Sequence, residues 1–396
     1  MSMKCTRTIK LKIDTPTDTF RSTIESYTKA FNYTCRVGWK DEDCDGVSLH
    51  KKVYPTTREY FPSQLAISAR MKATEALKSV KTKTKQVNRE NKWRFKWNET
   101  HLNKRPKKLR RVPKCPNSSQ ASIRYDMRSF NVWFDRNQIS LSTVEGRKTF
   151  DISIPEYFQQ YLSWKRCSAD LFVKNNKVFL HIVFEKNIEE TPSNGTCIGI
   201  DRGIRKLAVT SDKRFFGGGH VRRVSEKYKR LRSILQSKKH SAKRHFRKIS
   251  SKENRFRRDV NHCISKQIVS NLKPGSTIVF EKLEGIHSRT TVKKKERYQH
   301  SSWSFYQLEE FIKYKAEAKG ISIAYVDARH TSRGCSRCGY IDKNNREYQS
   351  FFRCKKCGYQ CNADLNASFN IVNRYLDSIS YPDRAVVNQP IARSLA

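Results

Sequence analysis

The stretch Cys197-Ile-Gly-Ile-Asp201-Arg-Gly-Ile-Arg-Lys-Leu-Ala-Val209 contains two apolar runs separated by a short polar segment, and the first run ends on a carboxylate. This pattern predicts a buried strand over 197–201, a short loop, and a neighbouring strand over 207–210. Asp201 would then lie at the end of a central strand. A single acidic residue there is weak evidence of function, because capping or strand-end solvation explains many such residues.

Two further acidic residues occur in similar settings. Glu281 ends the apolar run Thr277-Ile-Val-Phe-Glu281, and Asp364 opens a predicted helix over 362–376. Each has an ordinary alternative role, Glu281 as a surface partner of Lys282 and Asp364 as a helix N-cap. The strand ends of an open sheet converge, however, and three carboxylates gathered there would suit two Mg²⁺ ions. Asp327 ends another apolar run, Ile-Ala-Tyr-Val-Asp327, and is the main rival of Asp364 as the third metal ligand.

The charge of the chain indicates a polyanionic partner. Its 396 residues include 81 Lys+Arg and 37 Asp+Glu, a net charge of +44. Because the excess is spread along the chain, it favours nucleic acid over a single basic tail. A ribosomal or histone-like packaging protein would have little need for isolated acids after apolar strands. The composition and the acids together therefore predict a metal-dependent nuclease.

Two tracts concentrate the positive charge. Residues 78–114 hold fifteen Lys/Arg and two Glu, interleaved with Trp93, Phe95 and Trp97. These aromatics suit stacking on bases or sugars, but they would equally fit a solvated linker whose aromatics pack into a neighbouring core. Residues 222–258 hold sixteen Lys/Arg and two Glu, with apolar residues at helical intervals, which predicts long basic helices facing a nucleic-acid channel.

Four of the twelve cysteines have the spacing of a metal site. Cys335 and Cys338 form one pair, Cys354 and Cys357 form a second, and fifteen residues separate the pairs. A glycine follows each pair, which fits the tight turns of a tetrahedral four-cysteine zinc ribbon. The zinc would be structural, since four thiolates leave no open position. Cys361 could replace a ligand, although a place in the core where the last helix begins suits it better.

The remaining cysteines and the histidines show no second metal motif. The other cysteines lack paired spacing and are expected to be packing residues: Cys5, Cys35, Cys44, Cys115, Cys167, Cys197 and Cys263. The histidines contain no His-x-His pair, the arrangement by which a DNA-nicking relaxase holds its metal. A DNA-strand-transferring transposase is therefore disfavoured.

The sequence indicates an intracellular protein. No apolar run approaches the roughly 18 residues of a membrane span, and the first residues lack the apolar core of a secretory signal. We expect a cytoplasmic or nucleoid location. In a eukaryotic host, Lys104-Arg-Pro-Lys-Lys-Leu-Arg-Arg111 could serve as a nuclear signal, and otherwise it is a nucleic-acid contact.

The N-terminal half alternates between strand and helix patterns. Residues 6–13 predict a half-buried strand, and helical spacing follows from Pro16 and again over 62–77. Residues 121–185 are rich in strand patterns, with a hairpin about Asn175 and Asn176. The first strand is expected to join this later sheet, which makes the helices an insertion. The polar stretch 189–195 predicts a domain boundary.

Several motifs together resemble a known family. They are Gly-Ile-Asp201-Arg-Gly-x4-Ala-Val, Val-Phe-Glu281-Lys-Leu, Tyr314-Lys315-Ala with Gly320-Ile, Val326-Asp-Ala-Arg-His-Thr331-Ser332-x2-Cys335-x2-Cys338-Gly, and Asp364-x-Asn366-Ala-x2-Asn370-Ile. The chain is similar here to the TnpB proteins of insertion sequences, including their eukaryotic and giant-virus Fanzor relatives. These proteins are RNA-guided DNA endonucleases, related to type V CRISPR effectors. The resemblance is specific over about 197–373 and only architectural over 1–190.

The resemblance implies a fold of α/β type plus a β-barrel, with a split RuvC-type ribonuclease-H-like nuclease domain. It also implies five segments. They are a wedge β-barrel (1–15 and 95–190), a helical recognition insertion (16–94), the RuvC-like domain (196–328 and 361–376), a zinc ribbon (329–360) and a flexible C-terminal tail (377–396).

The resemblance further implies a function and a site. The chain would be an enzyme of a transposable element that pairs its guide RNA with target double-stranded DNA and cuts the DNA by metal-activated water. Asp201 would bridge two Mg²⁺ ions, with Glu281 and Asp364 holding one each, and Asp364 is preferred to Asp327. One protein chain per guide RNA is expected. Arg202 departs from the residue that many relatives carry. The alternative is a catalytically silent, RNA-guided DNA-binding repressor of the same fold.

Overall fold

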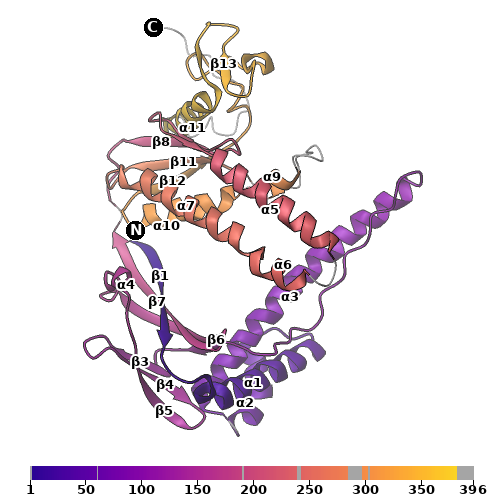
Figure 1. Ribbon diagram of the computed structural model, residues 1–396, viewed down its shortest axis with the longest axis vertical. Helices are drawn as coiled ribbons and strands as arrows, with labels where there is room; N and C mark the ends of the chain where they lie inside the picture. Colours follow the sequence, from indigo (N-terminus) through magenta and orange to yellow (C-terminus); the bar gives the residue numbers. More distant parts are fainter. Residues whose placement is uncertain are drawn as a thin grey trace. The chain divides into compact units, whose positions relative to one another are not determined.

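A computed structural model describes residues 2–59, 61–189, 191–238, 242–283, 297–301 and 304–380 (Figure 1). The chain divides into two compact units. We call Thr6–Lys186 the N-terminal unit, and Met1–Cys5 with Asn187–Ala396 the C-terminal unit. None of the described helices combines the length and the apolar content needed to cross a lipid bilayer.

Among the described residues, seven strands belong to the N-terminal half of the chain, and they form two sheets. The four-stranded sheet has the order β1-β7-β6-β2, and the three-stranded sheet has the order β3-β4-β5. Their bounds are β1 (Ser2–Ile13), β2 (Ile123–Tyr125), β3 (Phe130–Trp133), β4 (Gln138–Thr143), β5 (Gly146–Asp151), β6 (Lys165–Lys174) and β7 (Lys177–Glu189). The predicted hairpin joins β6 to β7, and Asn175 and Asn176 have φ values of 50° and 57°. The pairing of β1 with β7 confirms that the first strand joins the later sheet.

The described strands do not close into the expected β-barrel. The two sheets are linked by one isolated bridge, between Ile13 at the end of β1 and Ile152 just after β5. Strand β5 is polar, and none of its side chains is buried. Apart from Phe150, which packs against Phe20, β5 offers no large apolar side chain that a further strand could cover, and the sheets remain open among the residues that the structure describes.

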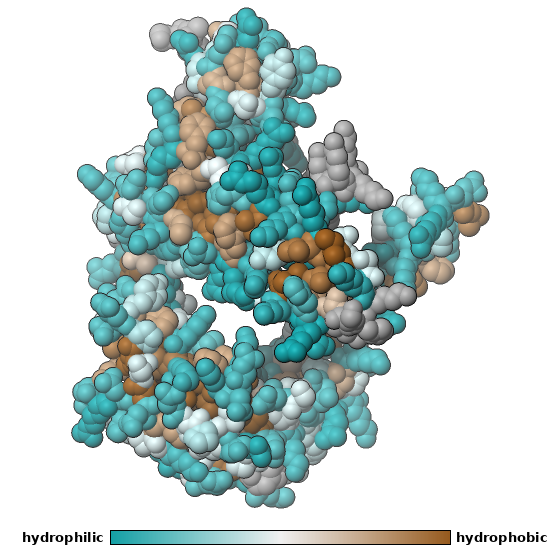
Figure 2. All heavy atoms as spheres, viewed as in Figure 1, coloured by the Kyte–Doolittle hydropathy of each residue, from teal (hydrophilic) through white to brown (hydrophobic). Residues whose placement is uncertain are grey.

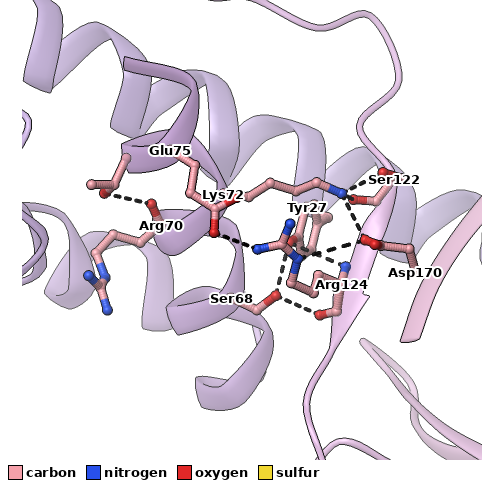
Figure 3. Close-up of polar contacts among 9 residues, drawn as sticks. Tyr27, Ser68, Arg70, Lys72, Glu75, Ser122, Arg124 and Asp170 are labelled. Carbon is pink, nitrogen blue, oxygen red and sulfur yellow. Dashed lines mark hydrogen bonds and ion pairs between the residues drawn. The ribbon is translucent and has the colours of Figure 1, made fainter. Parts of the chain in front are cut away.

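Helices pack on one side of the four-stranded sheet. They are η1 (Thr17–Phe20), α1 (Arg21–Lys40), α2 (Gly46–Arg58) and α3 (Ser63–Thr100). Polar contacts join α3 to the sheet, as Figure 3 shows: the Lys72 ammonium lies 3.0 Å from Asp170, and the Arg124 guanidinium lies 2.7 Å from Glu75. Helix α3 runs well beyond the predicted stretch 62–77, because Lys, Arg, Gln and Glu favour helix without an apolar stripe.

A five-stranded mixed sheet forms the centre of the C-terminal unit, in the order β10-β9-β8-β11-β12. Its strands are β8 (Cys197–Asp201), β9 (Lys206–Thr210), β10 (Phe215–Gly217), β11 (Thr277–Glu281) and β12 (Ser322–Val326). Strands β8 and β12 are both parallel to the central β11, and β9 is antiparallel to β8. The two strands predicted within 197–210 are therefore confirmed as neighbours.

Helices cover both faces of this sheet. Ile278 and Phe280 of β11 pack on one face with residues of two helices, α7 (Lys252–Ser270) and α10 (Phe305–Glu317). Val279 packs on the other face with Ile371 of α11 (Ala363–Ser380). Ile278 and Phe280 face one side of the sheet and Val279 the other, because successive side chains of a strand point to opposite faces. The basic tract contributes α5 (Gly219–Ser237) and α6 (Lys243–Ser250) before α7, and α9 (Arg297–Ser301) follows β11.

Helix α11 lies directly on β8. A Cβ atom built on Gly199 would meet the carbonyl oxygen of Ser368 at 2.2 Å, so only glycine allows this approach. The helix continues to Ser380, so residues 377–380 of the predicted flexible tail are helical. The rest of that predicted tail, 381–396, lies outside the described residues.

Candidate functional site

The structure brings Asp201, Glu281 and Asp364 together. Asp201 ends β8, Glu281 ends the adjacent parallel strand β11, and Asp364 lies in the first turn of α11, which packs on β8. Burial, and after it the negative charges of Glu281 and Asp364, raise the pKa of Asp201 to about 8. Charges act in this way only at short range, so the three carboxylates form a loose cluster. Within the described residues, the group whose ligand atoms lie close enough together for one metal ion is the four cysteines described below, not these carboxylates.

The other two carboxylates are also held in unfavourable surroundings for a negative charge. Burial raises the pKa of Glu281, against the effect of a hydrogen bond from Thr331. Burial likewise raises the pKa of Asp364, against the effect of Arg346. The Glu281 residue is 9% exposed, and the Asp364 side chain is 18% exposed. Three such oxygen donors are the set that a hard divalent cation such as Mg²⁺ prefers.

Asp327, the rival third carboxylate, lies at the margin of the cluster. Its side chain is 60% exposed, and its backbone carbonyl accepts a hydrogen bond of 2.7 Å from Arg374. Its charge acts on Glu281, whereas Asp364 acts on Asp201. The geometry therefore favours Asp364 as the third member.

Arg346 is a member of the site that the sequence did not reveal. Its guanidinium lies 3.0 Å from the Asp364 carboxylate and donates a hydrogen bond of 2.7 Å to the carbonyl of Gln349. The residue belongs to the cysteine-rich segment, and no local pattern marks it. Only the packing of that segment against α11 shows the contact.

Arg202 has a structural partner that the sequence also did not reveal. Its buried guanidinium forms an ion pair with Glu309 of α10 and donates a hydrogen bond of 2.8 Å to the carbonyl of Glu281. The Tyr325 hydroxyl donates to the same Glu309 carboxylate at 2.8 Å. The guanidinium also lies 4.8 Å from the Phe280 ring centroid. Arg202 thus ties the end of β8 to the end of β11, where two of the carboxylates lie.

The four predicted zinc ligands form one cluster. The sulfur atoms of Cys335, Cys338, Cys354 and Cys357 all lie within 4.8 Å of one another, and two of the pairs are 3.6 and 3.7 Å apart. Sulfur atoms around a tetrahedral zinc are about 3.8 Å apart, given a Zn–S bond of about 2.3 Å. The donor set therefore fits zinc, and Cys361 is not part of it.

The two cysteine turns have matching geometry. Gly339 and Gly358 adopt φ values of 75° and 69°, a conformation that glycine allows. Each glycine N–H donates to the carbonyl of the first cysteine of its pair, Cys335 at 2.9 Å and Cys354 at 3.0 Å. The prediction that these glycines allow tight turns after the cysteine pairs is confirmed.

Three asparagines join the cysteine cluster to the helix that carries Asp364. Asn366 donates to the carbonyl of Gly334 at 2.7 Å and accepts from the N–H of Ser336 at 3.0 Å. Asn370 donates to the same Gly334 carbonyl at 2.7 Å, and Asn373 donates to the carbonyl of Ser336 at 3.0 Å. The cluster therefore orients the start of α11.

Comparisons with known proteins agree with this arrangement. A family model described as "Cas12f1-like, TNB domain" matches residues 305–371, and one described as "Probable transposase" (OrfB_IS605) matches residues 181–283. The chain is 32% identical over 273 residues to the TnpB-like protein MJ0751 of Methanocaldococcus jannaschii, a match that covers 64% of this chain and 97% of that protein.

The chain also matches parts of longer proteins. It is 33% identical over 230 residues to the CRISPR-associated endodeoxyribonuclease Cas12f1 of Syntrophomonas palmitatica, covering 46% of this chain and 45% of that protein. A second Cas12f1, of Sulfoacidibacillus thermotolerans, is 34% identical over 180 residues, covering 44% and 37%. The chain thus spans less than half the length of these two relatives.

A solved structure shares the mixed α/β fold of this chain. The protein in a Cas12f1–sgRNA–target DNA complex superimposes with a TM-score of 0.56 at 16% identity, covering 89% of this chain and 82% of that one. At this identity the likeness establishes a shared mixed α/β fold.

Proposed function

Because the chain belongs to the TnpB/OrfB family, with a TNB domain like that of Cas12f1, we propose that it is an RNA-guided, Mg²⁺-dependent DNA endonuclease of a transposable element. The convergence of Asp201, Glu281 and Asp364 is the observation that carries this proposal. The pKa values of all three carboxyl groups are raised, and the negative charges of Glu281 and Asp364 contribute to the raised pKa of Asp201. A cluster of carboxylates whose charge is poorly compensated suits cation binding better than a structural role.

The three carboxylates of Asp201, Glu281 and Asp364 would hold two Mg²⁺ ions. When bound, the ions would supply an activated water and stabilise the leaving 3′ oxygen of the DNA backbone. The chain's own residues position the donors: β8 and β11 deliver Asp201 and Glu281, and α11 delivers Asp364. Arg346 holds the Asp364 carboxylate, and Arg202 links the ends of the two strands.

The zinc site would have a structural role. Four thiolates complete a tetrahedral coordination shell, so no position remains for a substrate. Through Asn366, Asn370 and Asn373 the cluster holds the start of α11, and thereby Asp364. Zinc would support the active site from outside it.

The guide RNA and the target DNA would be bound by the positive surface. A net charge of +44 supplies many phosphate contacts. Helices α5, α6 and α7 carry the second basic tract, and α3 with the segment that follows carries the first. We assign 1–15 and 95–190 to a wedge domain and 16–94 to a recognition insertion. In the C-terminal part, 196–328 and 361–376 form the nuclease domain and 329–360 the zinc ribbon.

The test compares four single variants in a cleavage assay with guide RNA and matched DNA. The guide is first identified by sequencing RNA that co-purifies with the protein. Asp201→Ala, Glu281→Ala and Asp364→Ala should each lower cleavage by at least about a thousandfold, because each removes a metal ligand, while RNA binding stays within about twofold. Asp327→Ala is the matched control and should still cut, and EDTA should stop the parent protein.

Two results would contradict the proposal in different ways. Cutting by Asp364→Ala together with loss of cutting in Asp327→Ala would mean that the third ligand is assigned wrongly. Specific binding of guided target DNA by the parent protein without any cutting would favour the silent repressor.

A further inference from the structure

The C-terminal turns of α3 and the chain that follows lie outside the hydrophobic core. The buried residues of α3 end at Val87, although the helix continues to Thr100. Residues 104–111, which we call the strap, then run back along the helix (Figure 1). The space-filling view shows mostly hydrophilic side chains over this end of α3, with a few apolar ones among them (Figure 2).

Two asparagines of α3 clamp the strap to the helix. The Asn98 amide exchanges two hydrogen bonds with the backbone of Lys107, at 2.7 and 3.0 Å. The Asn91 amide exchanges two with the backbone of Arg110, at 2.7 and 2.8 Å. The two asparagines are two helical turns apart and therefore share one face. Lys104–Arg111 is thus held in one conformation along the helix.

Between these clamps lies a cluster that we call the clasp, made of Trp93, Trp97 and Lys107. The Lys107 ammonium lies 4.0 Å from the Trp93 ring centroid and 3.8 Å from the Trp97 ring centroid. Trp97 also stacks on His101, with centroids 4.3 Å apart and planes 9° apart. The two indole faces are therefore directed at one shared position, and the stack with His101 fixes the plane of one of them.

The aromatics of this tract are not packed into a neighbouring core. Trp93 is 56% exposed and Phe95 is 59% exposed. Of the two predicted roles for these residues, the structure therefore favours a surface role. Neighbouring exposed aromatic side chains of this kind are typical of interaction sites.

The clasp lies in a strongly positive field. Residues 78–114 have fifteen Lys/Arg and only two Glu, and one of these, Glu90, already pairs with Arg110 at 2.9 Å. Partial burial lowers the pKa of Lys107, and the charges of Arg94 and Lys104 lower it further. The ammonium is therefore held between the rings against repulsion from Arg94 and Lys104.

We propose that the clasp is a stacking site for an unpaired base of a bound RNA, which takes the position of the Lys107 ammonium between Trp93 and Trp97. Two ring faces directed at one position suit a flat base, and stacking on aromatic side chains tolerates any base. The strap cations, among them Lys108 and Arg111, contact the phosphates on either side. The clamped backbone keeps these cations in place beside the rings.

The partner is RNA because a chain of this charge needs a resident polyanion. This inference rests on the proposed RNA partner but not on cleavage, since the clasp contains none of the three carboxylates. Target DNA is present only during the reaction, and its displaced strand offers unpaired bases only after the guide has paired with the other strand. RNA loops and bulges instead offer unpaired bases that aromatic side chains can stack on.

The test measures binding of two RNA probes to the full chain purified free of nucleic acid. One probe is a short single-stranded RNA of mixed sequence, and the other has the same backbone with abasic residues. Trp93→Ala and Trp97→Ala should each weaken binding of the first probe by about tenfold and leave the abasic probe unchanged. Trp39 of α1 is also a half-exposed tryptophan, so Trp39→Ala is the matched control and should change the binding of neither probe.

A third variant separates stacking from charge. Lys108→Ala removes an exposed strap cation outside the clasp, so it should weaken binding of both probes alike and reduce the salt dependence. Equal loss of both probes in Trp93→Ala, or no loss in either tryptophan variant, would overturn the stacking site. Tighter binding of single-stranded DNA than of RNA would overturn the RNA assignment. Failure of the parent chain to bind either RNA probe would overturn both the clasp and the RNA partner of the proposed function. Loss of DNA cleavage alone would bear on the proposed endonuclease activity and not on the clasp.

Discussion

At the residue scale, Asp201 shows why the cluster has the character of a binding site. Its charged form is opposed by burial and by two further carboxylates, so the isolated chain stabilises this residue poorly. Arg346 and Arg202 lower the pKa of Asp201, but they do not cancel the shift. A bound divalent cation would remove the unfavourable interaction. Without such a ligand, an uncharged residue at this position would make the fold more stable.

The variant Asp201→Asn should therefore be more stable than the parent chain in EDTA. Between the ordinary Asp pKa of 3.8 and the folded value of about 8, the folded chain binds more protons than the unfolded chain. Stability of the parent consequently falls as pH rises through this window. Above pH 8 the variant should gain up to about 6 kcal/mol, at about 1.4 kcal/mol for each unit between the two pKa values, and near pH 4 almost nothing.

Thermal melting over this pH range, with and without Mg²⁺, checks the prediction. Mg²⁺ should raise the melting temperature of the parent more than that of Asp201→Asn. A variant that melts below the parent at high pH in EDTA would mean that the Asp201 charge stabilises the fold.

At the element scale, the packing of α11 on β8 decides where Asp364 lies. Gly199 permits this packing because its missing Cβ leaves room for the Ser368 carbonyl. Gly199→Ala should cost about 2–4 kcal/mol of stability, since a backbone carbonyl cannot turn aside as a long side chain can. Gly217→Ala, on β10 where an added Cβ meets nothing, is the control and should cost less than about 1 kcal/mol. Denaturant unfolding of both variants measures the difference.

The zinc ribbon is the second element whose integrity the site requires. One zinc per chain is expected, and Cys338→Ser or Cys354→Ser should release it and loosen the start of α11. Cys361→Ser should retain zinc, because Cys361 lies outside the four-sulfur cluster. Metal analysis of the purified proteins decides this. A parent chain without zinc, or a Cys361 variant that loses it, would contradict the assignment.

At the scale of the whole molecule, the net charge of +44 makes the free chain self-repelling. RNA should therefore raise the melting temperature, and RNA affinity should fall by at least about 100-fold between about 50 mM and 200 mM salt. Guided cutting should also require RNA, since base pairing and not the protein reads the sequence. The check supplies the RNA-free chain with duplex DNA and Mg²⁺. Efficient cutting at one defined sequence would indicate an ordinary sequence-specific endonuclease.

Local patterns in the sequence determined much of this protein. Apolar runs with a two-residue period predicted the strands that end on Asp201 and Glu281, and the paired cysteines with their glycines predicted the four-sulfur cluster. These features depend on residues close in sequence, because strand burial, turn geometry and ligand spacing are local properties. Because these patterns are local, they fail where an element has no local pattern to mark it. Helix α3 was predicted too short, because its basic half has no apolar stripe to mark it.

Tertiary structure alone decided which distant residues meet. The contacts of Arg346 with Asp364, of Arg202 with Glu309, and of Lys107 with Trp93 and Trp97 join segments that no local pattern links. The open sheets in place of a closed β-barrel were decided in the same way, since closure depends on how strand edges pair across the fold. Side-chain contacts of this kind depend on how whole elements pack, and here that packing is set by features such as the missing Cβ of Gly199.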